Sequence, residues 1–569
     1  MPMSLLPIAL LLVTLLASCA TVPADHADMP EKQPVFNPES RALYLYSRAR
    51  LASLEGDYPT ALSNLRDAIE LDPSSAVLHT AVAEIKLKIG QVPEALEYLN
   101  KAIKLNPNLR EPYLMGGTIM GNAGKDWEAA DYLRKAIKLD PVKEDAYLQL
   151  AISLTRLLEY EEAVNTLKTL VKLNPDSVLG YYYLGRTYSQ MKLYRDAVGY
   201  YKKALELRPE FSQAAIDMAA TYEAQGDYPH AIEIYRSLLE SDDNKVAVLQ
   251  RLIQLLIQQR RFDDALEYLY RAIDMGLAGP ETKRKIGLLH LELEQYDDAI
   301  GIFNEMLKDN PVNPQIRLYL GMAYEEKGEL DRAYEEFTKI SHGSQAYIEA
   351  IGHIAFILKE KGKSGQAIDI LKDAIATNPG QIELYLNLAS LYESIDKLDD
   401  GVQLLLQAEK RFSSDTRLLF RLGVLLDKQG NKNESIERMK RVIALNPKDA
   451  QALNFLGYTY AELEIHLDDA LKYLKQAVDI RPNDGFILDS LGWVYYKLKK
   501  YDEALKYLEM AIALVEEDST IAEHLGDIYL AKRDYKKALK QYKRAQELDP
   551  ARKELGDKVR RLKGEQTDR

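Results

Sequence analysis

Cysteine is almost absent from this sequence, since Cys19 is the only one in 569 residues. A single thiol cannot form an intramolecular disulfide, so the fold has to be held together by packing alone. An excess of basic residues is also missing, because 87 Asp and Glu outnumber 74 Lys and Arg and give a formal net charge of -13. Affinity for DNA or RNA comes largely from neutralised phosphates, and this balance therefore argues against a nucleic-acid-binding protein.

Long hydrophobic runs are confined to the start of the chain. Residues 5–17 (LLPIALLLVTLLA) are apolar, but this run is shorter than the roughly 20 residues that a membrane-spanning helix needs. Its position and length are typical of the hydrophobic region of a signal peptide. We therefore expect residues 1–18 to be a cleaved signal peptide.

The four residues from Leu16 to Cys19 (LASC) resemble the lipobox of bacterial lipoproteins. The resemblance implies that the Cys19 sulfur carries a diacylglycerol group and that Cys19 becomes the first residue of the mature chain. More than one acyl chain then anchors the protein to a membrane surface without crossing it. The alternative is an ordinary signal peptide whose cleavage region contains a cysteine, and the absence of Lys and Arg from residues 1–4 (MPMS) fits that alternative.

The segment that follows the signal peptide is rich in proline. Residues 19–39 contain Pro23, Pro30, Pro34 and Pro38 among polar side chains. Such a segment has too little apolar surface to form a core. We predict an extended tether of about 3.1 Å per residue between the lipid and the folded part of the protein.

Proline also marks a period of 34 residues along the rest of the chain. It stands at positions 73, 107, 141, 175 and 209, and again in phase at 311, 379 and 447. One extra residue within AELEIHLDDA (461–470) moves the last prolines of the series to 482 and 550. Fifteen repeats therefore fit between residues 40 and 550, and we number their positions so that this proline is position 32.

Small and large residues occupy fixed positions in each repeat. Position 8 is Gly or Ala in fourteen repeats, position 20 is Ala in thirteen, and position 24 is large. A small residue lets two helices touch, and the helical spacing on two segments joined by a turn predicts a helical hairpin in every repeat. Neither helix can bury its apolar face alone, so neighbouring hairpins have to stack.

The pattern of LG or LA, then Y, then A, then LDP at 34-residue spacing resembles the tetratricopeptide repeat. The resemblance implies an all-α solenoid, a right-handed superhelix of about fifteen helical hairpins over residues 40–550. It also implies a concave surface built mainly from the first helix of each pair. Residues 551–569 are polar, and we expect a C-terminal capping helix and tail there, because the last repeat of a solenoid needs a polar outer face.

The repeats leave no room for a catalytic domain, and we predict that the chain is not an enzyme and holds no metal or cofactor. The stretch GKS (362–364) suggests a phosphate loop, but the earlier glycine that this motif needs is missing. The glycine-rich stretch GGTIMGNAG (116–124) falls on a predicted helix and does not follow a strand. The eight histidines show no metal-ligand spacing.

A candidate partner-binding surface lies in the last three repeats. Positions 2, 5, 9 and 12 of a first helix share one face, and the family resemblance implies that this face lines the concave groove. Around Trp493, one of only two tryptophans, the face combines aromatic and polar side chains, as binding hot spots do. We predict a partner-binding site made of Asn454, Tyr458, Phe486, Asp489, Trp493, Tyr496, Glu523 and Asp527. The alternative is that Trp493 packs laterally against a neighbouring repeat.

Three stretches of the same region, NFLGYTYAE (454–462), LDSLGWVYYKL (488–498) and AEHLGDIYL (522–530), go beyond the general repeat pattern. They are similar to outer-membrane tetratricopeptide lipoproteins of Gram-negative bacteria, which include an adaptor for a carboxyl-terminal processing protease. This resemblance implies a lipid-anchored scaffold that faces the periplasm and binds protein partners, such as a protease and its substrates. By the sorting preference of such lipoproteins, Ala20 after the lipidated cysteine implies the outer membrane.

Other functions remain open from the sequence. Similar lipoproteins assist the assembly of type IV pilus secretins or of polysaccharide export machinery. If the start of the chain is not processed, a cytosolic assembly chaperone is the alternative of another class. Two connectors without the repeat proline, residues 276–280 and 340–345, contain glycine and are candidate hinges, with simple drift of the repeat as the alternative.

Overall fold

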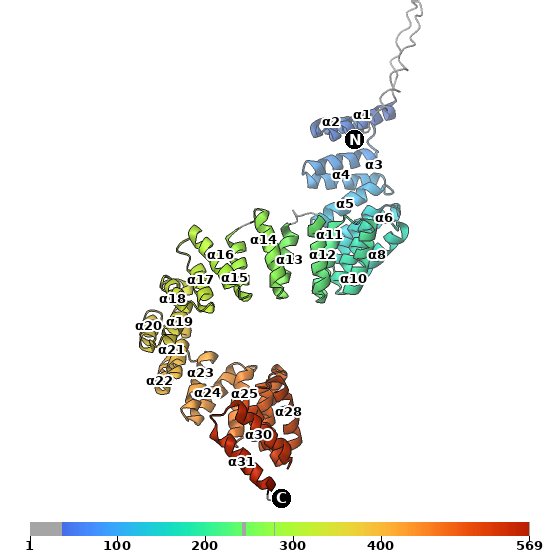
Figure 1. Cartoon of the computed structure of the whole chain (residues 1–569). Coiled ribbons are helices and arrows are strands. Elements are labelled where there is room, and N and C mark those ends of the chain that lie inside the picture. Colours follow the sequence, from blue (N-terminus) through green and yellow to red (C-terminus); the bar gives the residue numbers. More distant parts are fainter. Residues whose placement is uncertain (1–36, 242–245, 278, 568–569) are drawn as a thin grey trace, which may run out of the picture. The chain divides into compact units, whose positions relative to one another are not determined.

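The structure is a computed structural model that describes residues 37–241, 246–277 and 279–567. The chain divides into two compact units, which we call the N-terminal unit (residues 1–261) and the C-terminal unit (residues 262–569). Across the described residues, helix is the only regular secondary structure (Figure 1). The predicted all-α fold class is therefore confirmed. The predicted signal peptide, Cys19 and most of the predicted tether lie outside the described residues.

The helices of the N-terminal unit are short and similar in length. They are α1 (Pro38–Leu54), α2 (Tyr58–Leu71), α3 (Ala76–Lys88), α4 (Val92–Leu105), α5 (Arg110–Asn122), α6 (Asp126–Leu139), α7 (Glu144–Arg156), α8 (Tyr160–Leu173), α9 (Val178–Gln190), α10 (Tyr194–Leu207), α11 (Ser212–Gln225), α12 (Tyr228–Ser241) and α13 (Val246–Gln258).

The C-terminal unit continues the same series. Its helices are α14 (Phe262–Asp274), α15 (Pro280–Glu292), α16 (Tyr296–Asp309), α17 (Pro314–Glu326), α18 (Leu330–Thr338), α19 (Gln345–Glu360), α20 (Ser364–Thr377), α21 (Ile382–Ser394), α22 (Leu398–Glu409), α23 (Thr416–Lys428), α24 (Lys432–Leu445), α25 (Ala450–Glu462), α26 (Leu467–Ile480), α27 (Gly485–Lys497), α28 (Tyr501–Leu514), α29 (Ser519–Ala531), α30 (Tyr535–Leu548) and α31 (Lys553–Thr567).

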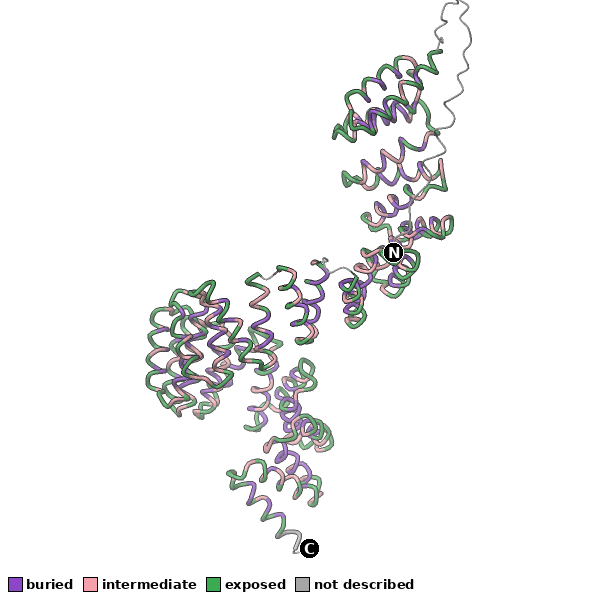
Figure 2. The backbone as a smooth tube through the Cα atoms, turned by 45° about the horizontal axis from the view of Figure 1, so that its top comes forward, coloured by how far each residue is buried: buried purple, intermediate pink, exposed green. Residues whose placement is uncertain are grey.

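Successive helices pair as the 34-residue period predicts. Helices α1–α12 form six hairpins and α15–α30 form eight, while α13 and α14 are the two helices of repeat 7. Each hairpin packs on the next one within its unit, and the buried residues follow the helix surfaces between them (Figure 2). The expected count of about fifteen hairpins agrees with these helices.

The small residues of the repeat allow close contact between the two helices of a hairpin. The alanines at position 20, from Ala61 to Ala538, are fully buried. At position 8, a Cβ atom added to Gly526 would lie 2.6 Å from Cε1 of Tyr542, which occupies position 24 of the same repeat. Real Cβ atoms do not approach so closely, because packed interiors leave no such space. Position 8 is therefore small because a large residue from the second helix covers it.

The turn between the two helices of each repeat uses a left-handed residue at position 15. This residue has a positive φ in all fifteen repeats, from Gly56 (φ 80°) to Arg533 (φ 62°). Gly362, which belongs to the GKS stretch, is the turn residue of its repeat (φ 70°). The extra residue of repeat 13 lies in the turn between α25 and α26, where both Glu464 and His466 have positive φ. The insertion is therefore absorbed without interrupting either helix.

The last helix, α31, packs on the second helix of repeat 15 and buries Leu555, Val559 and Leu562. The two candidate hinge segments connect helices: α14 ends at Asp274 before α15 begins at Pro280, and α18 ends at Thr338 before α19 begins at Gln345. With nine residues, α18 is shorter than its counterparts. Movement at these connectors stays a prediction.

Candidate functional site

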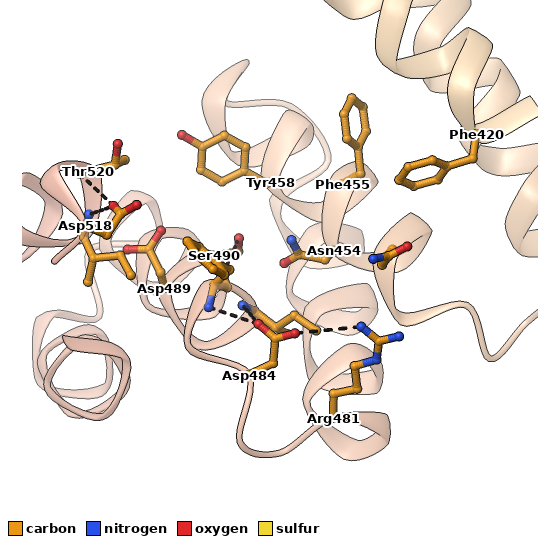
Figure 3. A pocket seen from close by; sticks show the side chains of 14 residues that line it. Phe420, Asn454, Phe455, Tyr458, Arg481, Asp484, Asp489, Ser490, Asp518 and Thr520 are labelled. Atoms are coloured by element: carbon orange, nitrogen blue, oxygen red, sulfur yellow. Dashed lines mark hydrogen bonds and ion pairs between the residues drawn. The ribbon is translucent and has the colours of Figure 1, made fainter. Parts of the chain in front are cut away.

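A hollow of about 470 Å³ lies in the C-terminal unit, over the first helices of repeats 12 to 15 (Figure 3). We call it the C-terminal hollow. Side chains of α23, α25, α27 and α29 form it, together with residues that precede α27 and α29. It is lined by Phe420, Gln451, Asn454, Phe455, Tyr458, Arg481, Asp484, Phe486, Ile487, Asp489, Ser490, Asp518, Thr520 and Ile521.

Aromatic rings line one side of the C-terminal hollow, where Tyr458, Phe455 and Phe420 follow one another (Figure 3). Phe420 and Phe455 meet edge to face, with ring centroids 6.2 Å apart and planes inclined at 68°. Phe486, the second residue of α27, leaves 56% of its surface exposed. Aromatic surface that is exposed beside polar groups suits the burial of an apolar side chain of a partner.

Helix ends supply part of the polar lining. Asp484 accepts hydrogen bonds from the backbone N–H groups of Phe486 (3.1 Å) and Ile487 (3.3 Å), which caps α27. Asp518 caps α29 in the same way, through Thr520 and Ile521. The carboxylates of these two caps are satisfied by the backbone that they hold. They fix the position of the aromatic and hydroxyl side chains that follow them.

Asn454 has an unused acceptor at the C-terminal hollow. Its side-chain Oδ1 atom is buried and has no hydrogen-bond partner among the described residues. A buried acceptor without a partner costs roughly 1–3 kcal/mol. Asn454 also contributes to the lining of the hollow, and a turn of its amide toward the hollow would let an N–H group of a bound segment remove that cost.

The eight residues predicted for partner binding fall into two groups in the structure. Asn454, Tyr458, Phe486 and Asp489 line the C-terminal hollow. The other four lie beside it, in a cluster that also contains a histidine: Trp493, Tyr496, Glu523 and Asp527.

Trp493 is buried, with only 7% of its surface exposed. Its ring stacks on His524 of the next repeat, with centroids 3.9 Å apart, and on Tyr496, with centroids 4.8 Å apart. Its Nε1 donates a hydrogen bond of 2.5 Å to Glu462 of the preceding repeat. Trp493 therefore packs laterally against neighbouring repeats, as the alternative prediction had it. It is not exposed on the groove.

His524 is a member of this cluster that the sequence analysis missed. It is buried, and its Nδ1 lies 2.9 Å from Oδ1 of Asp489, a residue that lines the C-terminal hollow. The two residues are 35 positions apart, on the facing sides of neighbouring first helices. Burial alone would lower the pKa of His524, but Asp489, with Asp527 and Glu523 nearby, outweighs it and raises the pKa. The contact of Nδ1 with the carboxylate holds Asp489 in place at the edge of the hollow.

The raised pKa of His524 predicts a pH-dependent contribution to stability. Because the folded-state pKa lies above the ordinary value of 6.5, the contribution is complete below that value and is lost as the pH rises through the folded-state pKa. We expect the difference in the free energy of unfolding between the native chain and His524→Gln to shrink from acidic to alkaline pH. Urea denaturation measures it, with His342→Gln as the exposed control. A difference that does not vary with pH would contradict the assignment.

The two acidic residues of repeat 15 in the predicted site, Glu523 and Asp527, are paired within the chain. Lys558 of α31 forms ion pairs with Glu523 (2.8 Å) and Asp527 (2.7 Å), and Arg552 also contacts Glu523. Burial would raise the pKa of Glu523, but these two cations outweigh it and lower the pKa. Glu523 and Asp527 are thus occupied by contacts with α31, and the remaining residues of the predicted surface lie in repeats 13 and 14.

A second hollow, of about 1080 Å³, lies over α17, α19 and α21. Its lining includes Glu325, Glu349, Glu383 and the exposed ring of Phe356. His353 faces it and lies 2.9 Å from Glu325. Apart from Phe356, this hollow lacks the aromatic lining of the C-terminal hollow.

Sequence comparisons identify the repeats independently. Models of the family described as Tetratricopeptide repeat match residues 52–115, 145–177, 178–211, 222–275, 284–341, 420–485 and 490–553, well over half of the chain. In the described part of the chain, none of the helices has the length and apolar character needed to cross a membrane.

Individual similar proteins cover the chain to different extents. The "TPR repeat-containing protein PA4667" of Pseudomonas aeruginosa is 30% identical over 107 residues, a match that spans 19% of this chain and 18% of that protein. Among solved structures, the APC/C hetero-tetramer Cut9–Hcn1 is 17% identical with a TM-score of 0.36, over 92% of this chain and 99% of the other. Yeast Tom70 is 16% identical with a TM-score of 0.35, over 74% and 95%.

Proposed function

Since the chain belongs to the tetratricopeptide repeat family, we propose that it is a lipid-anchored scaffold that binds a segment of a protein partner in the C-terminal hollow. The observation that carries the proposal is the lining of that hollow. Exposed aromatic surface lies there beside an unused buried acceptor, on Asn454, and both belong to helices that line the hollow. An extended segment would place an apolar side chain against Phe486 and donate a backbone N–H to Asn454.

The proposed cellular location is the periplasmic face of the outer membrane. The support for it is in the sequence: the apolar run of residues 5–17, the LASC stretch that ends at Cys19, and Ala20 after it. The proline-rich residues up to 39 would hold the repeats away from the lipid surface.

Replacing Cys19 tests the anchor. In Cys19→Ala, we expect fatty-acyl labelling to disappear and the membrane-bound fraction of the chain to fall to background, because no sulfur remains to carry the lipid. Ser18→Ala is the matched control, since it keeps a small residue before the cysteine. A native chain that takes up no label and stays in the soluble fraction would contradict the anchor and favour the cytosolic chaperone.

The proposed task of the scaffold is to bring a carboxyl-terminal processing protease to cell-envelope substrates. The three stretches that support this proposal form α25, α27 and α29, which are helices that line the C-terminal hollow. The resemblance and the candidate site therefore coincide in space. Assembly of type IV pilus secretins or of polysaccharide export machinery is the second candidate.

Affinity purification distinguishes these tasks when it is done in parallel with the native chain and with Phe486→Ala. If the scaffold serves a protease, we expect a protease and cell-wall hydrolases to be recovered with the native chain and to be depleted with the Phe486→Ala variant. Recovery of secretin or export subunits in the same pattern would favour the second candidate. Partners recovered equally with both chains would contradict binding in the C-terminal hollow.

A further inference from the structure

The first repeat exposes a face that all later repeats bury. Position 10 of the first helix packs on the preceding repeat, and in repeats 2 to 15 the residue there is at most 8% exposed. These residues are Ile85, Ile119, Ser153, Thr187, Thr221, Leu255, Leu289, Ala323, Ile357, Leu391, Leu425, Thr459, Val494 and Ile528. In repeat 1 the residue at position 10 is Leu51, and it is 58% exposed. This leucine is suited to a neighbour that the described part of the chain does not supply.

Charged residues surround this leucine. Position 7, which is buried and uncharged in repeats 2 to 15, is Arg48 in repeat 1, and the Arg48 guanidinium lies 5.9 Å from the ring centroid of Tyr44. Glu55 follows at the C-terminal end of α1, beside the exposed Leu54. We call Tyr44, Arg48, Leu51, Leu54 and Glu55 the end face. It combines apolar surface with one cation and one carboxylate, neither of which has an ion pair within the described residues.

The two ends of the solenoid differ. At the C-terminal end, α31 covers the last repeat with three buried apolar side chains, Leu555, Val559 and Leu562. At the N-terminal end, no helix among the described residues covers the corresponding face of α1. Terminal repeats normally present a polar outer face to water. The exposed side chains of Leu51 and Leu54 instead mark the end face as an interaction surface.

We propose that the end face binds the end face of a second copy of this chain. In a two-fold dimer, the same surface patch of each copy contacts that of the other. Two α1 helices that cross antiparallel near Leu51 would therefore place the end faces of both copies in contact. Arg48 and Glu55 are seven residues apart, two helical turns, so that Arg48 of one copy meets Glu55 of the second copy on both sides of the axis. The leucines fill the centre between these two ion pairs.

The balance of charge favours a second copy over an anionic lipid surface as the occupant. Residues 37–57 carry three basic side chains (Arg41, Arg48 and Arg50) and three acidic ones (Glu39, Glu55 and Asp57). A segment with no net charge, in a chain of net charge -13, gains nothing from anionic headgroups, which attract clusters of basic residues. The same alternation of charge makes the surface complementary to itself.

Cross-linking tests the dimer in cells that express the full chain. Leu51→Cys should give a dimer with a short bis-maleimide, because helix axes in contact lie about 8–10 Å apart. Val142→Cys, which is 78% exposed on a loop, and the native chain with Cys19 are the controls and should stay monomeric. If Leu51→Cys reacts with a simple maleimide but forms no dimer, the proposal is overturned. It is equally overturned if the thiol is protected without a dimer, because another segment or a lipid then covers the face.

Charge reversal provides the second test, in the Leu51→Cys background. Arg48→Glu and Glu55→Arg should each abolish the cross-linked dimer, since each places like charges together. The combination of both substitutions should restore it, because the ion pairs re-form with the signs exchanged. A combination that fails to restore the dimer would contradict the proposed two-fold arrangement, whatever the two single substitutions do.

Discussion

Trp493→Ala should lower the free energy of unfolding of the C-terminal unit by about 3–5 kcal/mol. The side chain is buried between His524 and Tyr496 and donates a hydrogen bond to Glu462. Its removal leaves a cavity between repeats 14 and 15 and an unpaired carboxylate at repeat 13. Because contacts in a solenoid are made between neighbouring repeats, the loss should be concentrated in repeats 13 to 15.

Urea denaturation measures the size of this loss of stability, and native-state hydrogen exchange shows which helices are affected. We expect faster exchange in α25, α27 and α29 and little change in the N-terminal unit. Trp127→Ala is the matched control, because the other tryptophan is 56% exposed and its loss should change stability by less than about 0.5 kcal/mol. Equal effects of the two substitutions would mean that Trp493 is not a core residue.

Phe486→Ala should weaken partner binding by about 30-fold or more, the loss expected for a central aromatic anchor. The ring is the most exposed aromatic surface at the C-terminal hollow, and a bound apolar side chain would cover it. The fold should be unaffected, since the ring is 56% exposed and Asp484 still caps α27. Titration of the purified partner with the native chain and with the variant measures the change in affinity.

Phe356→Ala is the matched control for this prediction. Its ring is 46% exposed and lines the second hollow, over α19. We expect this variant to bind the partner as the native chain does. A loss of affinity in Phe356→Ala with none in Phe486→Ala would move the proposed site to the second hollow.

The fold could be predicted from the sequence because its determinants recur within each repeat. Gly526 and Tyr542 are only 16 positions apart, and the same contact recurs in the other repeats that have glycine at position 8. Ala at position 20 is buried for the same reason. Periodic spacing therefore reports contacts within a hairpin, and it identified the helices, their pairing and the position of the extra residue in repeat 13.

The site could be predicted only in part, because contacts between repeats depend on the individual residues that meet. The position of Trp493 indicates the groove, but His524 and Glu462 come from the two neighbouring repeats and cover the ring. The pairing of Glu523 with Lys558 depends on where α31 packs, which no repeat pattern specifies. A search for charged pairs about 35 residues apart would have found His524 beside Asp489.

These contacts change which residue best tests the proposed function. Trp493 supports the fold, so its replacement would disturb binding and stability together. Phe486 separates the two effects, because it borders the hollow and contributes little to the core. Asn454 is the polar counterpart, since its Oδ1 atom has no hydrogen bond within the described residues that binding would have to break.

Photo-cross-linking in living cells shows whether a partner occupies the C-terminal hollow. A photoreactive amino acid replaces Phe486 in one strain and Trp127 in another, two positions that are both 56% exposed. We expect a specific protein adduct from position 486 and none of comparable yield from position 127. No adduct from position 486, in a chain that is folded and present at native level, would contradict binding of a partner in the hollow.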